Sequence, residues 1–241
     1  MILEFGKTQK LVLAGMFAGI IFLLQFTPLG LPQIPLIGSA TTLHIPVIIG
    51  GIMLGPKLGA ALGAVFGFSS MLFATTQSFA LNAFAFTPFR PVPGTDSGSL
   101  LSLLVAFVPR ILVGVVPPLV FAWMTGLARP LCEKLADRGL FAAGKGPREF
   151  RAASIAVAAV AGSLTNTLLV LNMIYFFFRE PWSYARMSEG IDAAQVTYAF
   201  ILGMIAGFGI PEAVVAGIVV PAVCMSLFAV ARAFVPARQA R

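Results

Sequence analysis

Residues 44–67, HIPVIIGGIMLGPKLGAALGAVFG, form an apolar stretch that turns once, at residues 55–57. After the turn, Gly59, Gly63 and Gly67 recur at four-residue spacing. Residues four apart stack on one face of a helix, so the second half presents a nearly bare stripe to a neighbouring helix. Helices in lipid associate through close backbone contact across small residues. The stretch therefore predicts a tight membrane hairpin at the centre of the fold.

The composition of the whole chain is that of an integral membrane protein. Of its 241 residues, 59% are hydrophobic and only 10% are charged, and the mean hydropathy is +0.95. A soluble domain has roughly a quarter charged residues. No segment alternates in the manner of a membrane β-barrel strand, so the spans are helical. We predict an all-α bundle of six transmembrane helices in a single membrane domain, residues 1–241, with spans at 8–26, 43–54, 58–75, 100–127, 152–178 and 196–234.

Two of these spans are irregular. Span 43–54 is short: as a helix it reaches about 20 Å, less than the roughly 30 Å of a hydrocarbon core. It leaves a recess on the outer side, with His44 near its rim. The last span contains Gly207 to Pro211, which predicts a broken helix, followed by Glu212. Glu212 could cap the restarted helix, carry protons or bind substrate.

The net charge of +7 is explained by membrane topology. Between the predicted spans, twelve basic residues fall on one side of the membrane and three, Arg90, Arg179 and Arg186, on the other. This asymmetry places both termini and a loop at about 128–151 in the cytoplasm. Because the charge marks orientation, we do not expect nucleic acid as a partner.

Polar and aromatic residues gather toward the outer half. Phenylalanines that include Phe86 interleave with Gln77, Asn82 and Arg90, as in the wall of a pocket for a small organic molecule, or in an interfacial aromatic belt. Arg110 lies inside a span, where it could pair with backbone carbonyls or bind an anionic ligand.

Span 152–178 also contains amides, at Asn166 and Asn172. Amides in membrane helices hydrogen-bond to neighbouring helices, and they can alternatively line a polar cavity. Both residues are therefore included among the candidate binding residues.

Groups that could perform catalysis are sparse. The chain has one histidine, and its two cysteines, Cys132 and Cys224, have no metal-ligand spacing. A near match to a phosphate-binding loop at 139–146 lacks the required Ser or Thr and a preceding strand. We therefore predict no enzyme, no catalytic or metal-binding residue and no cofactor.

Four segments in this order resemble the substrate-binding S-components of energy-coupling factor (ECF) vitamin transporters. They are TLHIPVIIGGIMLGPKLGAALGAVFG, FAFTPF followed by SLLSLLVAFVPRILVG, GSLTNTLLVLNMIY, and GIPEAVVAGIVVPAV. One departure is Gly209, where the resemblance leads us to expect asparagine, which puts a substrate contact there in doubt.

The resemblance implies a function and a set of partners. An S-component in a prokaryotic cell membrane would bind a water-soluble vitamin outside and release it inside, together with a membrane-embedded T-component and two cytoplasmic ATPases. Ala14 and Ala18 match the small-residue motif that contacts the T-component.

The substrate is less closely defined. Pantothenate is the first expectation, ahead of riboflavin and cobalamin, and Arg90 or Arg110 would suit its carboxylate. The alternatives from other classes are a self-sufficient proton-coupled carrier using Glu212 and a membrane enzyme with a hidden site.

Overall fold

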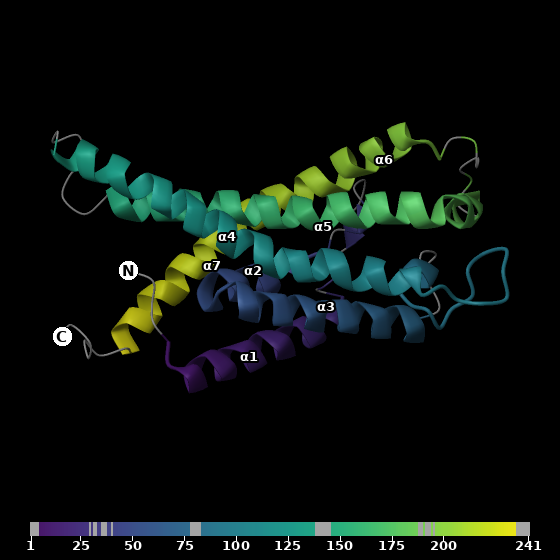
Figure 1. The fold of residues 1–241 in the computed structure, drawn as a ribbon, viewed down its shortest axis with the longest axis horizontal. Helices are drawn as coiled ribbons and strands as arrows, with labels where there is room; N and C mark the ends of the chain where they lie inside the picture. The colour runs from purple at the N-terminus through teal and green to yellow at the C-terminus, as the bar shows by residue number, and fades with distance from the viewer. Residues whose placement is uncertain are drawn as a thin grey trace.

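The computed structural model describes residues 5–28, 30, 33–34, 38–39, 41–77, 83–137, 146–187, 190, 194 and 196–234. Its described part is a bundle of membrane helices that run roughly side by side, with the last one crossing the others obliquely (Figure 1). The helices are α1 (Lys7–Gln25), α2 (His44–Leu54), α3 (Pro56–Thr76), α4 (Leu101–Asp137), α5 (Gly146–Met187), and a final one composed of α6 (Tyr198–Met204), the π-helical η3 (Ile205–Gly209) and α7 (Ile210–Phe234).

Five of these helices are long and apolar enough to cross a membrane, and α2 is a shorter apolar helix. The predicted six-helix architecture is therefore confirmed, with boundaries within a few residues of the predicted spans in the first three helices. Smaller elements occur in the connections: β1 (Gln33–Ile34) pairs antiparallel with β2 (Gly38–Ser39), and η1 (Ala83–Ala85) is a 3-10 turn.

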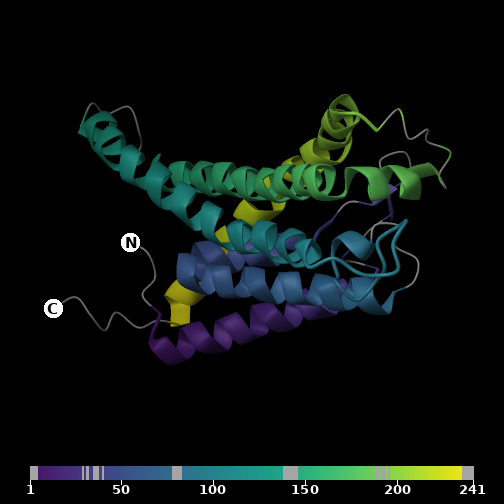
Figure 2. The same ribbon diagram turned by 45° about the vertical axis from the view of Figure 1, so that its right-hand side comes forward.

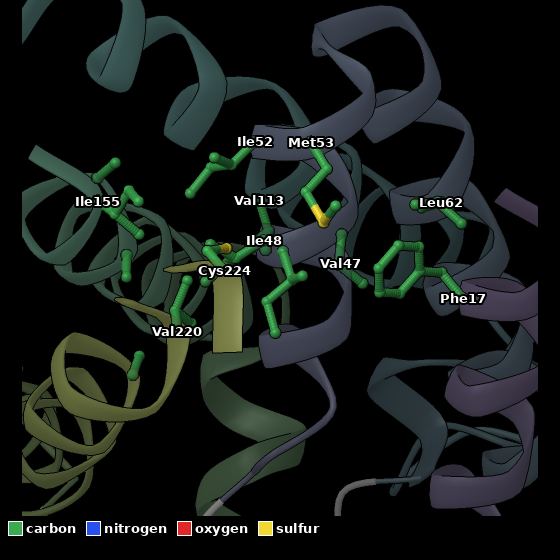
Figure 3. Packing of buried hydrophobic residues seen from close by; sticks show 14 of the residues in the cluster. Phe17, Val47, Ile48, Ile52, Met53, Leu62, Val113, Ile155, Val220 and Cys224 are labelled. Atoms are coloured by element: carbon green, nitrogen blue, oxygen red, sulfur yellow. The ribbon is translucent and has the colours of Figure 1, made fainter. Parts of the chain in front are cut away.

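Helix α2 lies at the centre of the bundle. Except for Ile45, all of its residues are buried, and it contacts α1, α3, α4, α5 and α7. Figure 3 shows Val47, Ile48 and Ile52 of α2 among side chains from these neighbours, including Phe17 of α1 and Val220 of α7. Because protein surrounds α2, a helix of 11 residues has no lipid-facing surface that must match the thickness of the bilayer.

The glycine stripe after the hairpin turn packs against α4. A Cβ on Gly59 or Gly63 would overlap the carbonyl oxygen of Gly114 or Arg110, and one on Gly67 would lie 2.8 Å from the carbonyl oxygen of Ala106. The contacts recur every four residues on both helices, which run antiparallel. The predicted close packing is confirmed, and its partner is α4.

The bundle has two ends, and each helix terminus or connection lies at one of them. The start of α1, the turn between α2 and α3 and the end of α7 lie at one end, where α4 also extends beyond the other helices (Figures 1 and 2). Because α4 continues to Asp137 and α5 begins at Gly146, the predicted loop at about 128–151 is partly helical. The segment containing η1, the end of α5 and the start of α6 lie at the opposite end, called the outer end below.

The predicted break in the last span is a π-helical turn. Pro211 has no backbone N–H, so the carbonyl four residues earlier, that of Gly207, loses its α-helical donor. The wider turn of η3 accommodates this position and lets the helix continue into α7.

Candidate ligand-binding site

Arg110 is buried within α4, directly after Pro109. The proline removes the N–H that would pair with the carbonyl of Val105 in a regular helix. The Nη1 of Arg110 donates a hydrogen bond of 2.7 Å to that carbonyl oxygen. The structural alternative for Arg110, a partner for a backbone carbonyl, is thus observed.

The remainder of the Arg110 side chain faces aromatic rings. Its guanidinium carbon lies 4.8 Å from the ring centroid of Phe86 and 5.5 Å from that of Phe66, both within cation–π range. Its Nε is buried without a hydrogen-bond partner. A desolvated cation with an unused donor between two rings can bind an anionic group, so the ligand role is compatible with the structural one.

The contact between Gly162 of α5 and α2 shows how deep two polar residues, His44 and Asn166, lie in the bundle. A Cβ on Gly162 would press against Ile48 of α2 and Pro117 of α4. His44 lies one helical turn before Ile48, and Asn166 lies one turn after Gly162 on the antiparallel helix. The structure therefore places His44 and Asn166 at a similar depth, one turn closer to the outer end than Gly162.

Two polar atoms of α5 are buried without a hydrogen-bond partner: Oδ1 of Asn166 and, one turn further from the outer end, Oγ of Ser163. The two ring nitrogens of His44 are buried as well, and the backbone of Thr41 is their interacting neighbour. Buried polar groups are normally paired, and exceptions mark strained, catalytic or ligand-binding positions. Ser163 was not among the predicted residues, although it lies one turn before Asn166 on α5.

Glu212 joins three segments at this depth. The backbone N–H of Thr41 donates to its Oε1 at 2.6 Å, and Oγ1 of Thr167 donates to its Oε2 at 3.0 Å. The carboxylate is thus bonded to groups outside its own helix, and the expectation that it caps α7 is not met. Sequence reasoning identified Glu212 as a deep carboxylate but missed both partners, which are distant in sequence.

Other predicted residues lie nearer the outer end of α3. The Nη2 of Arg90 donates to the carbonyl oxygen of Thr75 at 3.2 Å, beside a 2.7 Å hydrogen bond between the hydroxyls of Thr75 and Thr87. Arg90 thereby pairs with a carbonyl in the last turn of α3. Gln77 follows this helix as its C-cap, and Asn82 lies outside the described residues.

Asn172 is separate from this group. Its Nδ2 donates to the carbonyl oxygen of Leu168 at 2.7 Å, and its Oδ1 accepts from the hydroxyl of Tyr198 at 3.1 Å. The pair is partly exposed and joins α5 to α6. This is the interhelical hydrogen bond that was one of the two expectations for this amide.

A cleft of about 670 Å³ opens near the outer end, between the start of α4 and the part of α5 around Phe178. Residues 92–104 supply hydroxyl groups and leucines to its wall, and Phe177 and Pro181 supply the opposite side. The residues predicted to bind the ligand do not line this cleft. In the described part of the chain, no group of three His, Cys, Asp or Glu residues is placed to bind a metal ion.

Ala14 and Ala18 lie on α1 and pack, half buried, against the central core. The adjacent Gly15 and Gly19 are exposed, and a Cβ on either would meet no atom within 4 Å. The open face of α1 is therefore centred on the glycines, with the alanines at its edge.

The fold defines a multi-pass membrane protein with buried polar groups beneath its outer end. Residues 9–224 match the family described as ECF transporter, substrate-specific component, and the chain belongs to this family. It is the substrate-specific component of an ECF-type transporter.

A relative of known identity is the pantothenic acid transporter PanT of Lactococcus lactis subsp. cremoris (strain MG1363). The two sequences are 35% identical over 203 residues, which cover 83% of this chain and 90% of the relative.

Proposed function

We propose that this chain binds pantothenate at the polar layer between α2, α4 and α5 and delivers it across the membrane. The similarity to PanT over 90% of that protein carries the choice of vitamin. The buried Arg110, with its unpaired Nε between Phe86 and Phe66, supports the choice independently. A carboxylate is the ligand group that a desolvated guanidinium binds most strongly.

The other buried polar groups of the site can form hydrogen bonds with the rest of pantothenate. Pantothenate has a carboxylate at one end and an amide and two hydroxyls along its length. Asn166 and Ser163 have unpaired acceptor oxygens for its donors, and His44 has a buried imidazole ring. We assign Arg110 to the carboxylate, and His44 and Asn166 to the amide and hydroxyl groups, with Phe86 as apolar wall.

Four other predicted residues have lesser roles in this proposal. Arg90 and Asn172 are assigned to the surroundings of the site, because their described contacts are with the protein itself. Gln77 and Asn82 are given no contact with the ligand in this proposal.

The proposal includes the other subunits of a family complex. A T-component embedded in the membrane and two cytoplasmic ATPases would supply the energy, so this chain itself needs no ATP-hydrolysing site. The basic end of the bundle, with both termini, would face the cytoplasm of a prokaryotic cell, and the outer end would face outward.

Thermal unfolding of the purified protein against a panel of water-soluble vitamins tests the substrate. Pantothenate at about 100 times its Kd should stabilise the protein by about 2.7 kcal/mol, whereas riboflavin and cobalamin should have no effect. A shift with riboflavin or cobalamin alone would contradict the assignment. Pantothenate uptake driven by a proton gradient in vesicles that contain only this chain would contradict the need for ATPase partners.

A further inference from the structure

We propose that Glu212 is a positioning residue for the binding site, because its carboxylate ties the residues preceding α2 to α5 and α7. Its two oxygens accept hydrogen bonds from two different segments, the N–H of Thr41 and the hydroxyl of Thr167. The side chain is only 7% exposed. A carboxylate in an apolar span is unfavourable unless it faces such partners, so the two bonds account for its presence.

The next residue, Thr42, is hydrogen-bonded to the segment that follows α1. The N–H and the Oγ1 of Thr42 both donate to the carbonyl oxygen of Gly30, at 3.1 and 3.3 Å. The N–H of Gly30 in turn donates to the carbonyl oxygen of Thr27, just after α1. Thr41 and Thr42 therefore connect the entrance of α2 to both sides of the bundle. Glu212 supplies the connection to α5 and α7.

Helix α2 also lacks a cap of its own. Its N-cap, Leu43, makes no side-chain hydrogen bond, and its first turn contains no acidic residue. A negative charge near a helix N-terminus is favourable because it complements the helix dipole. The carboxyl group of Glu212, on another helix, bonds to the backbone two residues before this N-cap. The bond to Thr41, three residues before His44, holds the start of α2 and thus the position of His44.

The consequence for binding rests on the proposed function. Since His44 belongs to the proposed site, loosening the entrance of α2 should shorten the time that a ligand stays bound. Glu212 itself need not touch the ligand for this effect.

Backbone hydrogen exchange at Thr41, measured without ligand, tests the tie directly. Glu212→Ala should increase the exchange rate at Thr41 about tenfold or more, because the amide loses a charged acceptor. Glu212→Gln keeps a side-chain acceptor and should exchange more slowly than Glu212→Ala. Equal exchange in wild type and Glu212→Ala, or in Glu212→Gln and Glu212→Ala, would overturn the proposal.

A second pair of variants tests the α5 partner without changing the carboxylate. Thr167→Val removes the hydrogen bond between α5 and Glu212 and should raise exchange at Thr41. Thr165→Val is the matched control, because the hydroxyl of Thr165 donates to the carbonyl oxygen of Ala161 within its own helix. The same exchange rate in these two variants would contradict a tie through α5.

Pantothenate dissociation from the same proteins completes the test. We expect release from Glu212→Ala to be about tenfold faster, with little change in the association rate. If the wild type binds no pantothenate, the proposed function is wrong. The exchange data then still show whether Glu212 holds the backbone at Thr41. If wild type and Glu212→Ala bind pantothenate and release it equally fast, Glu212 is not a positioning residue for the site.

Discussion

The guanidinium of Arg110 donates a 2.7 Å hydrogen bond to the carbonyl oxygen of Val105. Pro109 leaves that carbonyl without its regular helical donor. The proline and the arginine that follows it therefore act as a unit: one opens a backbone acceptor and the other fills it. This relationship lets the structural and the ligand-binding contributions of Arg110 be measured separately.

Arg110→Met should destabilise the protein by about 1–3 kcal/mol, because the carbonyl of Val105 is left buried without a donor. Adding Pro109→Ala returns an N–H to the helix and should recover most of this loss. Pantothenate affinity should fall in Arg110→Met and should not recover in the double variant, because the cation is still absent. Thermal unfolding and calorimetric titration measure the two effects.

Pro109→Ala alone is the control, and it should bind pantothenate like the wild type. Full recovery of affinity in the double variant would show that Arg110 acts only through the backbone. Arg110→Lys keeps the charge but not the planar group, so it should bind pantothenate more weakly than the wild type and more strongly than Arg110→Met.

The glycine stripe allows a matched comparison of two helix faces. Gly63→Ala places a methyl group against the backbone of α4 and should destabilise the protein by about 1–3 kcal/mol. Gly15→Ala on α1 meets no atom within 4 Å and should leave the thermal unfolding temperature nearly unchanged. Equal unfolding temperatures for the two variants would mean that the α3–α4 contact is looser than described.

Local patterns were sufficient to predict most of this fold. The apolar runs defined the spans, and the four-residue spacing of Gly59, Gly63 and Gly67 identified a packing face, since both signals lie within one segment. What the sequence did not reveal is the partner of that face. The continuity of the last helix was also missed, because Gly and Pro weaken an α-helix without showing whether a π-turn can replace it.

The candidate site was less predictable because its contacts join distant segments. Thr41 and Glu212 are 171 residues apart, and Thr167 and Glu212 are 45 apart. No periodicity connects such positions. Composition does indicate that a carboxylate in an apolar span needs partners, but only the fold identifies them. The contact between Arg110 and Phe86 is likewise a consequence of how the segment around η1 folds over α4.

Arg90 should contribute to stability rather than to ligand recognition. Arg90→Ala removes a charge-assisted hydrogen bond to the carbonyl of Thr75 near the end of α3, and we expect a loss of about 1 kcal/mol. Pantothenate affinity should change less than threefold. A loss of affinity as large as in Arg110→Met, with unchanged unfolding temperature, would instead place Arg90 in the binding site.

The open face of α1 leads to a prediction about assembly. Gly15→Trp adds a large side chain where the structure has free space, so folding and pantothenate binding should be retained while co-purification with the T-component is lost. Ala14→Trp should also lower the unfolding temperature, because Ala14 packs against the core. Ile218→Trp on α7, where Ile218 is 68% exposed, is the control and should assemble normally. Normal assembly of Gly15→Trp would move the proposed T-component contact to another helix.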